Sequence, residues 1–464
     1  MFVNRVSELA LLEKHYQSNK AELFVLYGRR RVGKTELLAH FCQEKPHVFF
    51  VADQVSEQIL RANMSVAIND AIFGPGQVSA VYNTWDDLFN TLARQSQSKR
   101  LIVVIDEFPY LVGAYPPLAS MLQRIWDQLL KNSQIMLILN GSYIGMMEET
   151  VLGYQAPLYG RRTAQYLLEP LDFLDAQSFF LPYTSSDRLR AYAVYGGTPA
   201  YLQTIRPENS LETNIIETIL ERGAPLYDEV RFVLQQELRE PRNYFAVLQA
   251  IASGNTRQNE IKQATGLESI TPYLETLQQL HLVERTVPVT DSQPHKSRRG
   301  IYRLKDNYLR FWFRFVFPNW SQLERGAKEM VFNTVILPEI DHFSAIVFEQ
   351  VCRQYFWRVG LKGQLPFMPH QIDGWWQANE EVDLVILGEA EMMLVECKWS
   401  SRPVGTDILQ ELEAKSASVR REAGIEKVSL ALCSRSGFTK QLIELTRERE
   451  NIFLYNWDDM IGSG

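Results

Sequence analysis

The sequence predicts a multidomain α/β protein whose first domain is built on a parallel sheet. At 464 residues the chain is too long for one hydrophobic core, so several domains are expected. Apolar runs alternate with helix-compatible segments between residues 23 and 141. Such near-continuous apolar runs are typical of strands buried on both faces of a parallel sheet. A second set of these runs, after residue 380, predicts a smaller α/β domain.

The first domain is expected over residues 1–167, with a helical segment after it. Its strands are predicted where the chain reads LFVLYG, HVFFVA, LIVVIDE and IMLILNG. Residues 168–238 have helical spacing and no strand pattern, as in DRLRAYAVY and LETNIIETILERG. This segment is therefore predicted to be an all-helical lid.

The middle of the chain has the pattern of a winged helix. Residues 239–310 read as three short helices, then two strands around the polar loop TDSQPHKSRRG. The aromatic run NYLRFWFRFVFPNW leads into a linker at 311–340, whose rings we expect to hold domains together. Residues 341–464 form the C-terminal domain, with strands expected at EVDLVIL, MMLVECKW, VSLALC and IFLY.

Composition narrows the class of protein. The formal net charge of −7 argues against a uniformly basic surface, although a local basic patch remains compatible with it. Cys42, Cys352, Cys397 and Cys433 are scattered and form no CxxC pair, so neither a zinc site nor a disulfide framework is predicted. No run reaches the roughly 18 apolar residues of a membrane span, and the N-terminus has no apolar signal region. We expect a cytoplasmic protein without a membrane partner.

A phosphate-binding loop follows the first strand. The segment GRRRVGKT fits the pattern GxxxxGK[ST] and opens the helix TELLAHFC. Its backbone N–H groups and the helix N-terminus can surround phosphate oxygens, Lys34 can reach the β- and γ-phosphates, and Thr35 can bind Mg²⁺. The predicted ATP-binding residues are Gly28, Arg29, Arg30, Arg31, Val32, Gly33, Lys34, Thr35 and Glu36.

Polar residues at the ends of later strands complete the predicted ATP site. Asp106 and Glu107 end LIVVIDE, so Asp106 is the Mg²⁺ ligand and Glu107 the general base that polarises the attacking water. Asn140 ends the next strand as a candidate γ-phosphate sensor, with a capping role as its alternative. Arg161 and Arg162 can stabilise the transition-state charge, or form a structural salt bridge.

These residues resemble the archaeal-type ATPase family, a STAND-like branch of the AAA+ proteins. The resemblance rests on FVNRVSELALLE, LYGRRRVGKTELL, VVIDEFPYL, LILNGS, LYGRRT and YGGTPAYL, all within about the first 200 residues. It implies an AAA+-like P-loop NTPase sheet, an adenine pocket shaped by the first segment, a lid that carries Gly196 and Gly197, and a winged helix. Asn140 departs from the pattern, because relatives often have Thr there.

The last third is similar to the C-terminal domain often fused to these ATPases, which resembles PD-(D/E)XK restriction-endonuclease-like folds. Its residues are Glu349 on the first helix, Asp383 in EVDLVI, and Glu396 and Lys398 in LVECKW. Asp383 and Glu396 lie on neighbouring strands, and Lys398 shares a face with Glu396 because side chains alternate with period two. Glu349, Asp383 and Glu396 are the candidate Mg²⁺ ligands of a nuclease site. A nuclease-like fold used only for binding stays open.

Candidates for DNA contacts lie in three places. The third helix of the winged helix carries Glu268 and Glu275, which weaken its case as a DNA reader. The wing is more favourable, since His295, Lys296, Arg298 and Arg299 cluster there. A solvated loop is the alternative. Gln410 and Lys415, on the helix after Lys398, are further candidates for backbone contacts.

Together these features predict an ATP-binding, Mg²⁺-dependent ATPase that acts as a nucleotide-driven switch with DNA as its target, and whose last domain could cut DNA. One alternative is a regulatory or defence switch that binds protein and has an inactive nuclease-like domain. Another is a nuclease whose ATPase is vestigial. A homo-oligomer and an arginine supplied in cis or in trans both stay open.

Overall fold

The computed structural model describes residues 3–77, 81–238 and 240–462, which form two compact units. Unit 1 is Met1–Pro170 together with Thr198–Ala200, and unit 2 is Leu171–Gly197 with Tyr201–Gly464. Residues 1, 239 and 464, at which predicted domains begin or end, lie outside the described residues, as does residue 2 of the opening segment. The proposed boundaries inside unit 2 stay predictions.

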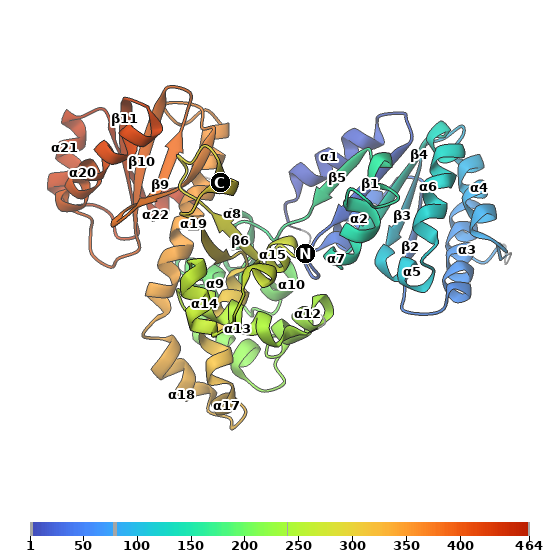
Figure 1. The fold of residues 1–464 in the computed structure, drawn as a ribbon, viewed down its shortest axis with the longest axis horizontal. Coiled ribbons are helices and arrows are strands. Elements are labelled where there is room, and N and C mark those ends of the chain that lie inside the picture. The colour runs from blue at the N-terminus through green and yellow to red at the C-terminus, as the bar shows by residue number, and fades with distance from the viewer. Residues whose placement is uncertain (1–2, 78–80, 239, 463–464) are drawn as a thin grey trace. The chain divides into compact units, whose positions relative to one another are not determined.

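Unit 1 contains a five-stranded sheet of order β2-β3-β4-β1-β5, in which every neighbouring pair is parallel (Figure 1). The four expected strands are present, which confirms the predicted P-loop type of fold. The edge strand β5 was not expected, because AQYL is short and only partly buried. The strands are β1 (Glu22–Tyr27), β2 (His47–Val51), β3 (Leu101–Asp106), β4 (Ile135–Gly141) and β5 (Ala164–Leu167).

Helices cover both faces of this sheet. Alternate strand residues contribute to two cores: Phe24 and Val104 face Leu12 and Leu37, whereas Val103 faces the other layer. Burial on both faces explains the continuous apolar runs. α1 (Val6–Tyr16) and α2 (Lys34–Cys42) form the first layer; α3 (Glu57–Phe73), α4 (Trp85–Gln95), α5 (Phe108–Ala114), α6 (Leu118–Gln128) and α7 (Ile144–Met147) contribute to the second.

Unit 2 begins with helices, as expected, and no strand occurs in its described residues before residue 283. The aromatic run is core: Trp312 is fully buried and its ring stacks on Phe317, while Phe245 packs edge-on against Trp312. The run thus joins the linker to the winged-helix segment. The helices include α8 (Phe173–Ala176), α9 (Ser185–Tyr195), α11 (Leu211–Ile215), α12 (Glu229–Glu237), α16 (Asn307–Phe311), α17 (Trp320–Leu323) and α18 (Lys328–Val331). The short helix α10 (Pro199–Leu202) begins in unit 1 and ends in unit 2.

Three helices and an antiparallel strand pair follow in the predicted order. They are α13 (Pro241–Ala252), α14 (Gln258–Thr265), α15 (Thr271–Gln279), β6 (Val283–Thr286) and β7 (Ile301–Leu304). The segment between β6 and β7 packs against the C-terminal domain. Val289 lies in the core of that domain, and its N–H donates to the carbonyl of Gly374 at 3.0 Å.

The C-terminal domain is a sheet of order β12-β11-β10-β9-β8 (Figure 1). β8, β9 and β10 are antiparallel neighbours, whereas β10, β11 and β12 run parallel. Leu394 packs on α20, and the adjacent Val395 position faces the other side. β8 was not expected. The elements are α19 (Ile340–Leu361), β8 (Gln371–Gln377), β9 (Glu380–Leu387), β10 (Glu391–Lys398), α20 (Thr406–Ala423), β11 (Lys427–Ser434), α21 (Lys440–Glu448), β12 (Ile452–Asn456) and α22 (Trp457–Gly462).

Among the described residues, no single helix is both long enough and apolar enough to cross a membrane. One pair, Lys328–Ile336 with Ile340–Leu361, meets those criteria of length and composition only when taken together, and it is bent by 67°.

Candidate functional site

The loop between β1 and α2 has the backbone that phosphate binding requires. Gly28 has φ +151°, and a Cβ there would lie 2.5 Å from the carbonyl oxygen of Leu168. Gly33 has φ +92° and caps α2. Both positions therefore exclude larger residues. The loop ends at the N-terminus of α2, where unpaired N–H groups favour an anion.

Lys34 and Thr35 occupy the positions that the pattern predicts. The Nζ of Lys34 donates to the carbonyl oxygens of Gly28 at 2.8 Å and Arg29 at 2.9 Å. Its ammonium thus lies inside the loop where phosphate oxygens would bind. The hydroxyl of Thr35 donates to Asp106 at 2.6 Å, so the P-loop is bonded directly to the end of β3.

Asp106 is the centre of a buried polar cluster. Its carboxylate accepts hydrogen bonds from Thr35 and from the amide nitrogen of Asn140, and Asp106 is only 1% exposed. Burial raises the pKa of Asp106 above its ordinary value, and the charge of Glu107 adds to the rise. A nearby cation would favour the ionised carboxylate. The side-chain amide oxygen of Asn140 is buried without a hydrogen-bond partner, so it is placed to accept a hydrogen bond from water held by such a cation. This donor set suits Mg²⁺.

Glu107 lies at the tip of β3 in a left-handed conformation, with φ 52°. A non-glycine residue in this region is uncommon, and residues held in such strained conformations cluster at active sites. The hydroxyl of Ser142, at the end of β4, lies 2.8 Å from both carboxylate oxygens of Glu107. The two strand ends therefore hold the carboxylate beside Asp106, where a general base is expected.

Three contacts at the loop were not foreseen from the sequence. Arg5 donates to the carbonyl oxygen of Val32 at 3.0 Å and pairs with Glu8 at 2.9 Å. Arg30 donates to the hydroxyl of Tyr110. The N-terminal segment thus braces the P-loop itself. The only sequence signal for it was the opening FVNRVSELALLE, which gave no partner for Arg5.

The segment Thr198–Ala200 belongs to unit 1 although it is embedded in the predicted lid. The N–H of Ala200 donates to the carbonyl of Arg31 at 3.5 Å, and Thr198 is buried. A Cβ at Gly33 would lie 3.9 Å from Pro199. The part of YGGTPAYL that follows the glycines therefore abuts the phosphate loop.

Arg161 and Arg162 make protein contacts instead of approaching the P-loop of this chain. Arg161 pairs with Asp127 at 2.9 Å, which is the salt bridge named above as the alternative. It precedes β5, at the edge where the parallel strands begin, whereas the P-loop follows β1 at the opposite edge. Arg162 donates to the carbonyl oxygens of Leu152 and Tyr159 at 3.2 Å each. Their role in catalysis stays a prediction for an arginine offered to a neighbouring chain.

The predicted nuclease acids are only partly brought together. Glu349 and Asp383 line one cavity of about 190 Å³. Burial, and after it the negative charge of Asp383, raises the pKa of Glu349 to about 8. Burial, then the charge of Glu396, raises the pKa of Asp383 to about 7. Glu396 itself pairs with Lys398 and, at 3.4 Å, with Lys415.

The three carboxylates that were expected to converge on one metal do not do so in the structure. Glu349, Asp383 and Glu396 do not bring their oxygens within 4.8 Å of one another. The physical reason is that Lys398 and Lys415 hold Glu396 toward α20. Lys415, predicted to contact DNA, is engaged in this pair. Residues of the predicted winged helix, including Arg303, also line the cavity at Glu349 and Asp383.

The wing is divided between solvent and the C-terminal domain. Arg299 pairs with Asp291 and Glu422 and donates to the carbonyl of Trp376, so its side chain is engaged within the protein, and its contact with DNA stays a prediction. His295, Lys296 and Arg298 are exposed. A cavity of about 400 Å³ beside them is lined by Arg257, Arg285, Arg298 and Arg299. Glu268 and Ser269 were predicted to lie on the third helix but precede it, since α15 begins at Thr271. Both are exposed, as are Thr271 and Glu275 on the helix, whereas Tyr273 and Gln278 are partly exposed.

Comparisons with known proteins match both ends of the chain. Residues 2–205 match an ATPase domain found predominantly in Archaea, and residues 312–417 match archaeal and bacterial proteins of unknown function. The uncharacterized protein MJECL04 of Methanocaldococcus jannaschii is 34% identical over 403 residues, covering 86% of this chain and 88% of the relative. The uncharacterized ATP-binding protein MJ0423 of the same organism is 58% identical over 45 residues, 10% of this chain and 76% of that protein.

Among solved structures, the Walker-type ATPase PABY2304 of Pyrococcus abyssi is similar in fold. It aligns with a TM-score of 0.51 at 21% identity and covers 67% of this chain and 96% of its own length. This similarity supports the P-loop fold of the first unit.

Proposed function

The chain belongs to the family of ATPases found predominantly in Archaea, and we propose that its ATP hydrolysis is a Mg²⁺-dependent switch that acts on DNA. The observation that carries the first half of this proposal is the bonded set Thr35, Asp106 and Asn140 behind the P-loop. The hydroxyl, carboxylate and amide of this set meet where the metal of a nucleotide complex is expected.

The roles of the residues follow from their positions. Lys34 donates to two carbonyl oxygens of the loop, and from this position its ammonium can bind oxygens of the β- and γ-phosphates instead. Thr35 and Asp106 hold Mg²⁺, and Asn140 accepts a hydrogen bond from water near it. When bound, Mg²⁺ neutralises charge on the phosphates. Glu107 polarises the attacking water and takes its proton, while Ser142 positions the carboxylate.

Steady-state ATP turnover by the full chain in Mg²⁺ tests this assignment. Lys34→Ala is expected to abolish nucleotide binding, whereas Glu107→Gln is expected to bind ATP normally and lose about 10²-fold or more in turnover. Lys14→Ala and Glu149→Gln, two exposed positions in the same unit, serve as charge-matched controls and keep wild-type rates. Wild-type turnover in Glu107→Gln would remove it as the base.

The DNA half of the proposal is supported by the exposed wing. Lys296 and Arg298 are exposed, and Arg298 lines a cavity together with Arg257 and Arg285, an arrangement of cationic side chains that suits contact with backbone phosphates. Replacing Lys296 and Arg298 with Ala should lower the slope of log Kd against log salt by about 2, since each phosphate contact contributes about 1. The matched control removes Lys362 and Lys440, two exposed lysines outside the winged helix.

A second candidate activity is DNA cleavage by the C-terminal domain. It is favoured by the shared cavity of Glu349 and Asp383 and by the adjacent ion pair of Glu396 with Lys398. A cleavage assay in Mg²⁺ and Mn²⁺ compares the wild type with Asp383→Asn and Lys34→Ala. Cleavage that survives Lys34→Ala but not Asp383→Asn supports a nuclease independent of ATP. If the rate of ATP turnover is the same with and without DNA, and no DNA is cleaved, a protein-binding switch is favoured.

A further inference from the structure

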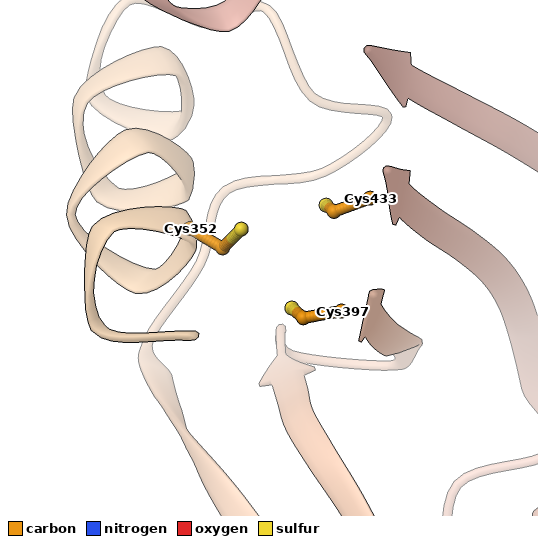
Figure 2. Close-up of side chains that lie close together, drawn as sticks. All are labelled: Cys352, Cys397 and Cys433. Carbon is orange, nitrogen blue, oxygen red and sulfur yellow. The ribbon is translucent and has the colours of Figure 1, made fainter. Parts of the chain in front are cut away.

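Three cysteines that the sequence scatters lie together in the C-terminal domain. Cys352 is on α19, Cys397 is on β10 and Cys433 is on β11. Their sulfur atoms all lie within 4.8 Å of one another, and all three residues are buried. Figure 2 shows the three side chains, from one helix and two strands, pointing toward a common point.

The fold explains why they converge. Cys397 and Cys433 are direct partners in the parallel pair of β10 and β11, so their side chains leave the sheet on the same face. Cys352 approaches that face from α19. The opposite face, with Leu394, Leu430 and the helix α20, forms a separate apolar core. The three sulfurs are therefore set by the backbone of three elements and not by flexible loops.

The spacing is close to that of a metal–thiolate centre. Sulfur atoms bound to one ion at about 2.3 Å lie about 3.8 Å apart. The sulfurs of this trio need to approach by no more than about 1 Å, a shift that small χ1 rotations can supply. Among the described residues, neither a histidine nor a carboxylate joins the group, so the donor set is sulfur only.

We infer that Cys352, Cys397 and Cys433 form a binding site for a single thiophilic metal ion. An all-sulfur set selects soft ions, of which Cu(I) and Zn²⁺ are the common choices. Three sulfurs complete a trigonal Cu(I) centre, whereas Zn²⁺ needs a fourth ligand such as water, so the geometry favours Cu(I). The site lies outside the proposed ATPase residues and outside the carboxylates of the proposed nuclease site.

Loading the site is a ligand exchange and needs no oxidant. Each thiol loses its proton to solvent as its sulfur bonds to the ion, and no electron is transferred. An ion held by α19, β10 and β11 would fix the helix that carries Glu349 against the strand that carries Glu396. Metal binding is therefore expected to stabilise the C-terminal domain against unfolding.

The test is the stoichiometry of metal binding by the reduced, full-length chain. Cu(I) under anaerobic conditions and Zn²⁺ are added separately, and bound metal is measured after removal of excess. We expect about one ion per chain, with sulfur-to-metal charge-transfer absorption in the ultraviolet. Cys352→Ser, Cys397→Ser and Cys433→Ser should each weaken binding by at least about tenfold. Cys42→Ser is the matched control, because Cys42 is buried in unit 1 outside the trio and its loss should change nothing.

X-ray absorption of the metal-loaded wild type gives a readout that needs no variant. A shell of three sulfurs supports the site, with a fourth light atom if the ion is Zn²⁺. A shell of oxygen and nitrogen, binding well below one ion per chain, or equal loss in Cys42→Ser overturns it. A disulfide between Cys397 and Cys433 that persists after treatment with reductant would also overturn the proposal. The tryptophan fluorescence and urea-unfolding midpoint of each metal-free variant should match those of the metal-free wild type, because the buried Trp375 and Trp457 report on the fold of unit 2. A loss of metal binding in a variant that passes this check cannot be assigned to misfolding of the domain that holds the trio.

Discussion

At the scale of single residues, the ATP site was readable because its pattern is local. Residues 28 to 35 are contiguous, and the strand before them and helix after them fix their conformation. Arg5 could not be read in this way, since its partner Val32 lies 27 positions along the chain. The same holds for Ser142, which meets Glu107 only because β3 and β4 are neighbours.

Arg5 supplies a prediction about nucleotide affinity. Its guanidinium donates to the Val32 carbonyl oxygen and so limits the conformations of the loop. In Arg5→Ala we expect ATP to bind about 5- to 10-fold more weakly, because the loop must then be ordered on binding. Turnover at saturating ATP should be nearly unchanged, since Arg5 contacts no proposed catalytic group. The measurement is a Kd titration with a fluorescent ATP analogue, beside the exposed-residue control Arg94→Ala.

At the scale of elements, the wing shows why a cluster of charges in sequence is not a cluster in function. Lys296, Arg298 and Arg299 are adjacent, but Arg299 finds Glu422 on α20, 123 positions away. No local pattern marks that partner. The strands β5 and β8 escaped prediction for a related reason: their short or partly exposed runs, AQYL and QIDGWWQ, lack the continuous apolar pattern of the central strands.

The two neighbouring arginines of the wing, Arg298 and Arg299, are expected to differ in how much they contribute to stability. Arg299→Ala leaves Asp291 and Glu422 without their partner, so the free energy of unfolding should fall by about 1–3 kcal/mol. Arg298→Ala removes an exposed side chain and should change stability by no more than about 0.5 kcal/mol. Urea unfolding monitored by tryptophan fluorescence checks both. Equal stability of the two variants would show that Arg299 does not anchor the wing.

The carboxyl of Glu349 on α19 predicts a pH dependence of stability. Burial, then Asp383, raises its pKa to about 8, from an ordinary value of 4.5. Between these values the unfolded chain has lost the proton that the folded chain keeps, so the unfolding free energy falls as pH rises from about 5 to 8. The substitution Glu349→Gln mimics the protonated carboxyl. It should therefore abolish this fall in the unfolding free energy, which is on the order of a few kcal/mol between about pH 5 and 8.

This dependence is measured by urea unfolding at a series of pH values without divalent ions. The variant should be more stable than the wild type near pH 8 and similar to it near pH 5. Glu444→Gln, an exposed glutamate on α21, should keep the wild-type slope. A wild-type slope in Glu349→Gln would mean that its carboxyl is ionised in the folded protein.

At the scale of the whole molecule, the proposed coupling between ATP and DNA has a structural route along the chain itself. Thr198–Ala200 packs with the P-loop in unit 1, and the residues on either side of it belong to unit 2. A rearrangement of the phosphate loop on ATP binding thus acts on a segment continuous with the lid. This arrangement supports a switch, because an effector must contact an element shared by two states.

A true switch must also obey reciprocity, which gives the sharpest prediction. If ATP changes the affinity for DNA by some factor, DNA must change the affinity for ATP by the same factor. The Glu107→Gln protein, expected to bind but not hydrolyse ATP, allows both affinities to be measured at equilibrium. We expect a factor of at least about 5, the lower end of ordinary coupling energies.

Because Pro199 lies against the loop at Gly33, Pro199→Gly should reduce that factor while leaving ATP affinity in the absence of DNA nearly unchanged. Two factors that both equal one would leave an ATPase without DNA as its target, and the protein-binding alternative would then account better for the exposed wing.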